Sequence, residues 1–426
     1  MKGNWSIETQ AVQGEYWPKN AEPRVLPLTQ STTYRYDTCE ELAKVFDLEQ
    51  ESHMYTRLSN PTTDAFEKKM ALMEGGVGAL ATSSGMSATV LAVLNIAQAG
   101  DGILASSTIY GGSFTLFTTT FKNLGIDVII FDPELSAEEI IALGKPNTKA
   151  IFGETIGNPL VNVIDFDKFS KVAKALDVPF IVDNTFATPA LCKPLTLGAN
   201  IVIHSTSKYI DGHASVLGGI IIDGGNYNWD NGKFSGLVEP DESYHGVSYT
   251  RQFSPSGYIV KARVQLMRNM GMTASPFNSY MMNLGSETLH LRMERHSENA
   301  LKMAKYLKNH EMCSWVKYPG LEDDKYYELA KKYLPKGASG VLTFGVKGGR
   351  DAGRKFINAL QLVALVTHVA DVRSCVLQPA STTHRQLSDE ELNSCGVSPD
   401  MIRFSVGIEN ADDIIADFEQ AFAQCK

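Results

Sequence analysis

Between residues 78 and 223, short apolar runs alternate with helical patterns, and this alternation restricts the possible folds more than any other feature of the chain. The expected strands cover 78–82, 102–106, 128–131, 150–154, 180–183, 201–204 and 219–222, and helical patterns cover 87–97, 115–124 and 166–176. Apolar strands separated by helices predict an α/β fold with a mostly parallel central sheet and helices on both faces. In such sheets the functional residues lie at the carboxyl ends of the strands.

The length of 426 residues favours two domains rather than one. Residues 1–62 are polar and rich in turns, and we interpret them as an N-terminal arm that packs on something outside its own segment. Residues 63–258 hold the predicted sheet, and residues 259–426 predict a smaller α+β domain. The elements expected outside the sheet are a helix at 63–73, a long helical region at 257–310, strands at 341–346 and 401–406, and helices at 351–360 and 411–424.

Charge and cysteine usage exclude several classes of function. A net charge of −9 argues against a nucleic-acid-binding protein, which usually needs a basic face. The six cysteines are scattered without a C-x-x-C pair, which argues against a zinc site and a disulfide framework. We therefore expect free thiols and no metal. We also expect a cytoplasmic protein, because neither a signal-peptide pattern nor a membrane-spanning apolar run is present.

Two charged residues lie at or shortly after the carboxyl ends of expected strands. Lys208 lies in HSTSKYIDGH, where its amine is well placed to form a Schiff base with an aldehyde cofactor; a solvated surface lysine is the alternative. Asp183 ends the apolar strand PFIVD, where a carboxylate is costly to bury unless it is paired. A pyridinium nitrogen is one partner that would stabilise this carboxylate, and a turn or helix-cap aspartate is the alternative.

Small and hydroxylated residues indicate a phosphate site. The segment TSSGMS (82–87) follows a strand and opens a helix, whose backbone amides and dipole bind phosphate well. Gly85 would allow close approach of the backbone, and Ser205 and Ser207 could hold a phosphate beside Lys208. Simple capping of the helix by serine is the alternative. No G-x-G-x-x-G motif follows the first strand, which argues against an NAD-type dehydrogenase.

Further candidates lie on other segments. Tyr110 could stack on a flat cofactor and move protons, and Asn158 in ETIGNP could bond a phenolate oxygen. Arg403 lies inside a strand pattern, where bidentate capture of a substrate carboxylate would explain it. Tyr55 and Arg57 in the arm supply a hydroxyl and a guanidinium that suits phosphate. The alternative is a half-buried structural tyrosine for Tyr110, a simple Asn-Pro turn for Asn158, and an internal salt bridge for Arg403. For Tyr55 and Arg57 the alternative is a solvated surface pair.

Taken together, the blocks YTRLSNPT, SSGMSA, IYGG, ETIGNP, VDNTF, HSTSKYIDGH, PASTTH and IRFSVGIE resemble the Cys/Met-metabolism family of enzymes that use pyridoxal 5'-phosphate (PLP). The resemblance covers nearly the whole chain and implies a fold-type-I transferase architecture. It implies that Lys208 carries the cofactor, that Asp183 contacts the pyridine nitrogen and that Tyr110 stacks on the ring. The remaining matching positions are Ser84, Gly85, Met86, Ser205 and Ser207 at the phosphate, and Asn158, Ser374 and Arg403 near the cofactor oxygen and the substrate carboxylate.

Tyr55 and Arg57 resemble a pair that reaches the phosphate of a neighbouring subunit, so the resemblance implies shared active sites and a homotetramer built from dimers. Within the family, the run SPFNSYMMNLGSETLHLRMERHSENA and two other blocks are most similar to O-acetylhomoserine sulfhydrylases. That similarity implies γ-replacement, in which O-acetyl-L-homoserine and sulfide give L-homocysteine and acetate, or methanethiol gives methionine. A methionine γ-lyase or another lyase of the family is the alternative, although Gly112 stands where methionine γ-lyases typically have cysteine.

The segment VADVRSCVLQPASTTH departs from the family pattern. It has Ala370 where glycine is more frequent and Gln378 where histidine is usual, and Arg373 and Cys375 are unusual neighbours of Ser374. Because this loop lies near the substrate in relatives, it is where substrate preference is least predictable.

Overall fold

The computed structural model describes residues 5–425 except 384, 387 and 395. Its central sheet has seven strands. The strand order is β1 (Gly78–Thr82), β7 (Gly219–Asp223), β6 (Ile201–His204), β5 (Phe180–Asp183), β4 (Thr148–Glu154), β2 (Gly102–Ser106) and β3 (Asp127–Phe131). Within this sheet, β7 runs opposite to the other six strands. The predicted mostly parallel sheet is therefore confirmed, and each expected strand is present with ends shifted by two residues at most.

Helices cover both faces of this sheet, as predicted. Alternate residues of one strand belong to different cores: Leu104 packs with α3 (Pro61–Glu74) and α7 (Phe166–Leu176), whereas Ile103 packs with α4 (Gly85–Leu94) on the opposite face. Asn60 caps α3 by accepting a hydrogen bond from the Thr62 amide, and Gly75, with φ of 82°, ends it. The predicted helix at 115–124 is instead α5 (Gly111–Thr115) followed by a π-helical segment, Leu116–Phe121.

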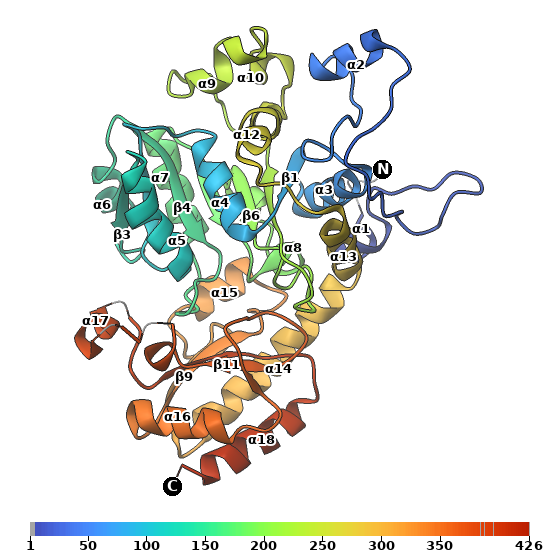
Figure 1. Cartoon of the computed structure of the whole chain (residues 1–426). Helices are drawn as coiled ribbons and strands as arrows, with labels where there is room; N and C mark the ends of the chain where they lie inside the picture. The colour runs from blue at the N-terminus through green and yellow to red at the C-terminus, as the bar shows by residue number, and fades with distance from the viewer. Residues whose placement is uncertain (1–4, 384, 387, 395, 426) are drawn as a thin grey trace.

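A second, five-stranded sheet forms the smaller α+β part, in the order β10 (Ala364–Leu365), β11 (Cys375–Leu377), β12 (Met401–Ser405), β9 (Val341–Val346) and β8 (Cys313–Lys317). It is antiparallel except for the pair β10–β11. Three helices cover one face of this sheet: α14 (Leu289–Asn309), α16 (Gly349–Ala359) and α18 (Ala411–Ala423) (Figure 1).

The long helical region predicted at 257–310 is interrupted. It consists of α11 (Gly257–Lys261), a π-helical segment (Ala262–Met267), α12 (Arg268–Met270), α13 (Pro276–Glu287) and α14. The interruption follows Gly271, whose φ of 73° is left-handed, and ends at Pro276 in the first turn of α13. Ile259 and Met267 still pack with the first sheet, and the core of the second sheet begins at Ala300. We propose that the boundary between the two parts lies within α14, rather than at the predicted position 258.

Several short elements have no clear pattern in the sequence. In the arm these are α1 (Ile7–Gln13) and α2 (Cys39–Phe46). Elsewhere they are α6 (Ala137–Ala142), α8 (Thr188–Leu191), α9 (Ser235–Val238), α10 (Tyr249–Gln252), α15 (Tyr327–Tyr333), α17 (Asp389–Ser394) and three 3₁₀ turns, Pro194–Leu197, Glu242–Tyr244 and Pro379–Ser381. In the part of the chain that the structure describes, no helix combines the length and apolar character needed to cross a membrane.

A buried ion pair joins α3 to β1 and to the segment after α11. Arg263 Nη2 lies 2.5 Å from Glu67 Oε2, and the other carboxylate oxygen of Glu67 accepts a hydrogen bond from the Ala81 amide at 2.7 Å. Arg263 also donates to the carbonyl oxygens of Leu58 and Ala79. Burial raises the pKa of Glu67, so its charge depends on the arginine.

We expect Arg263→Met to lower the free energy of unfolding by about 3–5 kcal/mol, because it leaves the Glu67 carboxylate buried without a partner. Arg295→Met is the matched control, since Arg295 pairs with Glu298 on the surface and both side chains are more than half exposed. The control is expected to change stability by less than about 1 kcal/mol. Chemical denaturation of both variants measures the difference, and equal effects would contradict a structural role for the buried pair.

Candidate active site

A cavity of about 210 Å³ lies where the strands of the first sheet end and face the second sheet. Its walls come from residues that follow β1, β2, β4, β5 and β6, together with β12 and the segment before β11. The structure brings ten of the predicted site residues to this cavity: Ser84, Gly85, Met86, Tyr110, Asn158, Asp183, Ser205, Ser207, Lys208 and Arg403.

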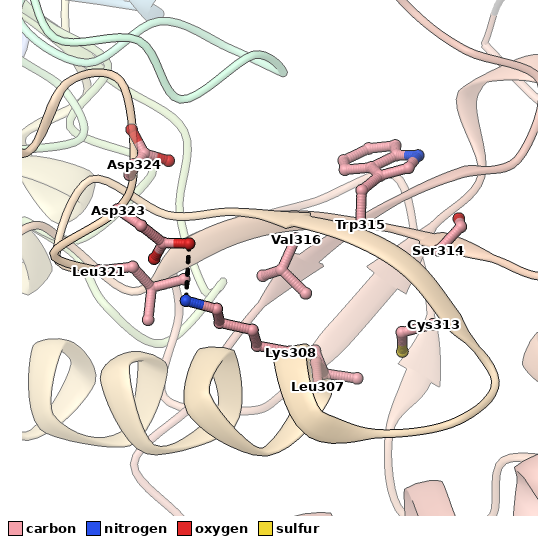
Figure 2. A pocket seen from close by; sticks show the side chains of 9 residues that line it. All are labelled: Leu307, Lys308, Cys313, Ser314, Trp315, Val316, Leu321, Asp323 and Asp324. Carbon is pink, nitrogen blue, oxygen red and sulfur yellow. Dashed lines mark ion pairs between the residues drawn. The ribbon is translucent and has the colours of Figure 1, made fainter.

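A second cavity, of about 280 Å³, lies between the end of α14 and β8 and contains none of the predicted residues (Figure 2). Its clearest polar feature is the ion pair between Lys308 and Asp323, at 2.6 Å. Burial raises the pKa of the Cys313 thiol to about 12, so this cysteine is a neutral and poor nucleophile. The first cavity is therefore the better candidate for an active site. Among the described residues, no group of three or more His, Cys, Asp or Glu side chains is arranged to hold a metal ion.

Lys208 is held on a turn directly after β6. Its Nζ lies 3.1 Å from His368 Nδ1, and burial, followed by the charge of Arg403, lowers its pKa to about 8. The hydroxyl of Ser207 donates to the carbonyl oxygen of Gly218 and accepts from its amide, which ties the turn to the start of β7. An amine with this pKa is partly unprotonated near neutral pH and can act as a nucleophile or a base.

A lowered pKa alone does not single out Lys208. Burial also lowers the pKa values of Lys69 and Lys261 to about 8. Lys69 donates to the carbonyl oxygen of Asn283 and Lys261 to that of Asn95, and neither lysine lines the cavity. Lys208 differs from both in its access to the cavity.

Half-buried Asp183 and buried Glu154 place two carboxyl groups side by side in the cavity, because their strands pair in register. Burial raises the pKa values of both, and the charge of Asp183 raises that of Glu154 further. Asp183 Oδ1 accepts hydrogen bonds from the amide and hydroxyl of Thr185, at 2.9 and 2.5 Å, whereas Glu154 Oε1 accepts from the Tyr110 amide at 2.7 Å. Within the described part of the chain, no basic side chain forms an ion pair with Asp183, so a cationic ring nitrogen would supply the missing partner.

The start of α4 faces the same cavity as Lys208 and has the groups to bind an anion. Ser84 caps this helix by accepting a hydrogen bond from the Ser87 amide at 3.1 Å, so the simple capping role considered for the segment is also real. The first amides of a helix have no partner within it and attract anions. A Cβ atom at Gly85 would lie 2.6 Å from Cβ of Ser205, so only glycine allows this close approach of the two loops.

Arg403 is a buried cation without a carboxylate partner among the described residues. Its side chain projects from β12, its Nη1 donates to Asn158 Oδ1 at 3.3 Å, and its Nη2 donates to the carbonyl oxygen of Thr367 at 3.1 Å. Its Nε is buried and has no hydrogen-bond partner in the described part of the chain. Burial lowers the pKa of Arg403 to about 10, so it stays charged at neutral pH. The internal salt bridge considered from the sequence is not formed, and the cavity can accept an anionic ligand at this point.

Three predicted site residues lie outside the cavity lining. The guanidinium of Arg57 lies over the ring of Tyr55, 5.0 Å from its centre, and both side chains are exposed on the arm. Ser374 was expected near the substrate, but it is buried, its hydroxyl donates to Glu409 Oε2 at 3.0 Å and it accepts from the Gly407 amide at 2.9 Å. The hydroxyl of Ser374 is thus occupied by structural bonds.

Several polar residues at the cavity or at Lys208 were not singled out from the sequence. Glu154 and Thr185 line the cavity, and His368 contacts Lys208. Glu154 ends an apolar strand, as Asp183 does, so the same pattern could have identified it. Thr185 lies in the block VDNTF two residues after Asp183. No signal in the sequence indicates that His368 approaches Lys208, because the two residues are 160 positions apart.

Comparison with known proteins adds an independent finding. The model of the family described as Cys/Met metabolism PLP-dependent enzyme matches residues 8–423. The chain is 46% identical to an O-acetyl-L-homoserine sulfhydrylase of Leptospira meyeri, covering 99% of this chain and 97% of the relative. It is 44% identical to a homocysteine synthase of Schizosaccharomyces pombe, covering 93% of each. A solved structure assigned as an O-acetylhomoserine (thiol)-lyase of Campylobacter jejuni, which contains N'-pyridoxyl-lysine-5'-monophosphate, superposes with a TM-score of 0.94 at 37% identity, covering 98% of this chain and all of that one.

Proposed function

Because the chain belongs to the Cys/Met metabolism PLP-dependent enzyme family, we propose that it is a transferase that catalyses γ-replacement on O-acetyl-L-homoserine. Sulfide as the second substrate gives L-homocysteine and acetate, and a small thiol such as methanethiol gives methionine. The observation that carries this proposal is the meeting of the Lys208 amine, the Asp183 carboxyl and the unpaired Arg403 guanidinium in one cavity. Sulfhydrylase and synthase names among relatives at 42–46% identity support the choice of reaction.

The residues of the cavity fit PLP. Lys208 would bind its aldehyde carbon, and Asp183, which otherwise lacks a cation, would face its ring nitrogen. The start of α4 would hold the phosphate through Ser84, Gly85 and Met86, with Ser205 on the facing turn. Ser207 also lines the cavity, but its hydroxyl is already bonded to the amide and carbonyl of Gly218. The half-exposed ring of Tyr110 would stack on the cofactor ring, and Asn158 would approach its phenolic oxygen. When bound, PLP withdraws electrons from the substrate and stabilises negative charge on the carbon next to its amino group.

The protein's own residues would then bind the substrate and move its protons. Arg403 would hold the α-carboxylate, since it is a buried cation with free hydrogen-bonding capacity. Lys208 would remove the proton from Cα, because a pKa of about 8 leaves part of the amine unprotonated at neutral pH. Lys208 or Tyr110 would move the proton at Cβ that accompanies departure of acetate from Cγ. Sulfide then takes the place of acetate at Cγ.

Arg403→Lys is expected to raise KM for O-acetylhomoserine by about 10- to 100-fold, because lysine keeps the charge but loses the two parallel bonds to a carboxylate. KM for sulfide should stay unchanged. Arg263→Lys is the matched control, since Arg263 is largely buried but does not line the cavity. Steady-state kinetics with each substrate varied separately measures the effect, and an unchanged KM for O-acetylhomoserine in the Arg403 variant would contradict the carboxylate role.

Product analysis tests the reaction itself. The purified protein with PLP is incubated with O-acetylhomoserine plus sulfide and, separately, with methionine alone. We expect homocysteine and acetate in equal amounts from the first mixture and little product from the second. Substantial α-ketobutyrate and methanethiol from methionine, without homocysteine from the first mixture, would replace the proposal with a methionine γ-lyase.

We also propose a homotetramer built from dimers that share active sites, acting in the cytoplasm. The exposed pair of Tyr55 and Arg57 in the arm supports this assembly, because a hydroxyl and a guanidinium suit a phosphate that a neighbouring subunit would present. The described cysteines, Cys39, Cys192, Cys313, Cys375 and Cys425, are free thiols, which is compatible with a reducing compartment. Light scattering of the holoenzyme tests the assembly.

A further inference from the structure

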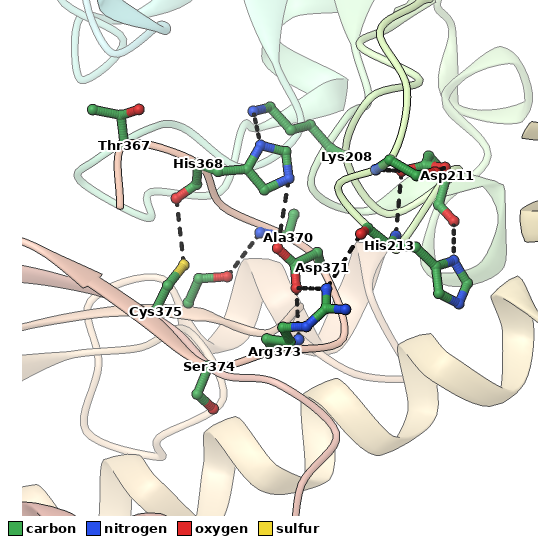
Figure 3. Close-up of polar contacts among 12 residues, drawn as sticks. Lys208, Asp211, His213, Thr367, His368, Ala370, Asp371, Arg373, Ser374 and Cys375 are labelled. Atoms are coloured by element: carbon green, nitrogen blue, oxygen red, sulfur yellow. Dashed lines mark hydrogen bonds and ion pairs between the residues drawn. The ribbon is translucent and has the colours of Figure 1, made fainter. Parts of the chain in front are cut away.

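His368 reaches Lys208 from the second sheet. It lies on the segment between β10 and β11, and its Nδ1 is 3.1 Å from Lys208 Nζ (Figure 3). On the other side of the imidazole ring, Nε2 lies 3.8 Å from Oδ2 of Asp371, whose side chain is 7% exposed. Nε2 is buried and has no hydrogen-bond partner in the part of the chain that the structure describes. The ring therefore stands between an amine and a buried carboxylate.

The segment that carries His368 is held in place from several sides. The amide of Ala370 donates to Ser405 Oγ at 2.8 Å, and the amide of Val372 donates to the carbonyl oxygen of Gly212 at 2.9 Å. Ala370 has a φ of 68°, a left-handed conformation that glycine adopts more easily. A non-glycine residue keeps this conformation only where its surroundings enforce it, so the position of His368 is determined by packing.

The charges around His368 determine which of its nitrogen atoms carries hydrogen. Lys208 and Arg403 are the cations that face it, and Asp371 and Asp211 are the anions. Burial and Lys208 together lower the pKa of His368, so the ring is neutral at neutral pH. The carboxylate of Asp371 beside Nε2 favours hydrogen on that nitrogen, which leaves Nδ1 as an acceptor toward Lys208. The nearby Cys375 thiol, which donates to the carbonyl oxygen of His368, is neutral because burial raises its pKa to about 11.

We propose that His368 is a positioning residue for Lys208: its Nδ1 accepts a hydrogen bond from the Lys208 nitrogen, and Asp371 holds the ring in the tautomer that permits this bond. The proposal rests on the proposed PLP site at Lys208. An acceptor at this point orients the nitrogen and stabilises its protonated form, because hydrogen bonds to charged groups are stronger than those between neutral groups. Removing the acceptor should therefore make the Lys208 nitrogen lose its proton at lower pH.

The test titrates the visible absorbance of bound PLP with pH in the holoenzyme, because this spectrum reports the proton on the nitrogen that joins Lys208 to the cofactor. Two variants of similar size are compared. His368→Leu removes the acceptor, whereas the amide oxygen of His368→Asn can replace Nδ1. We expect the titration midpoint to fall by about one pH unit in the leucine variant and by less than about 0.3 unit in the asparagine variant.

Asp371→Asn provides a second measurement that leaves His368 in place, and it should lower the midpoint in the same direction by less than the leucine variant does. His213→Phe is the matched control, since His213 bonds to the carbonyl oxygen of Asp211 and does not contact Lys208. Equal shifts in the leucine and asparagine variants, or a midpoint unchanged in both His368→Leu and Asp371→Asn, would overturn the proposal. Homocysteine formation is measured on the same samples, so that failure of the γ-replacement reaction is distinguished from failure of the His368 contact.

Discussion

Lys208→Ala is expected to lower kcat for homocysteine formation by about 10⁴-fold and to abolish the yellow colour of the purified protein. The reason is that one amine performs two tasks: it would bind the cofactor and then remove the proton from Cα, and general base catalysis alone contributes up to about 10⁴-fold. Its burial next to Arg403 explains why it can act as a base near neutral pH, since both lower its pKa to about 8. Absorbance spectra and initial rates measure the two effects separately.

Lys69→Met is the matched control for this experiment. Lys69 has the same lowered pKa of about 8 and is even less exposed to solvent than Lys208, but it lies on α3 and points to Asn283 and Glu287. The control should keep both the colour and at least about a third of wild-type activity, because a change in packing away from the cavity affects stability rather than the reaction. A Lys208→Ala protein that stays yellow and active would contradict the assignment of this lysine.

Asp183→Asn is expected to lower kcat by about 10²- to 10³-fold, with a much smaller change in KM for O-acetylhomoserine. Asparagine keeps the size and the hydrogen bonds of the side chain but cannot carry the negative charge that keeps a ring nitrogen protonated. The loss should fall on the step in which negative charge develops, as it does when a single electrostatic contact to a transition state is removed. Steady-state kinetics of the PLP-saturated variant measures kcat and KM.

Asp223→Asn is the control that separates the proposed role of the Asp183 charge from the general effect of changing a carboxyl group inside the protein. Asp223 also ends a strand of the first sheet, accepts a hydrogen bond from the Gly225 amide, and has a pKa that burial raises to about 7. It does not line the cavity, so Asp223→Asn should keep kcat within about threefold of wild type. Similar losses of kcat in the two variants would show that Asp183 acts on the fold rather than on the reaction.

Much of the first sheet was predictable because its strands are buried on both faces and are therefore continuously apolar, as in FIVD and IVIH. The same rule located Asp183 and Lys208, since parallel strands bring their carboxyl ends to one edge of the sheet. Strands β10 and β11 were missed because they are only two and three residues long, and β8 was missed because four of its five positions are at least partly exposed.

Contacts between distant segments were the part of the site that could not be predicted. His368 meets Lys208 only because the second sheet packs against the ends of the first, and no local pattern encodes that approach. Ser374 stays a prediction: the family resemblance places it near the substrate, and in the structure its hydroxyl donates to Glu409, 35 positions away. Ala370 has a left-handed φ, a conformation that suits the glycine which the family resemblance leads us to expect at this position.

Reduction of the holoenzyme with borohydride tests whether this cavity holds PLP on Lys208. Borohydride makes the bond between a lysine and the cofactor permanent, and peptide mass spectrometry then identifies the lysine. We predict one pyridoxyl phosphate group per chain, on the peptide that contains Lys208. Modification of Lys69 or Lys261, the other buried lysines with pKa values of about 8, or no modification of any lysine, would contradict the account.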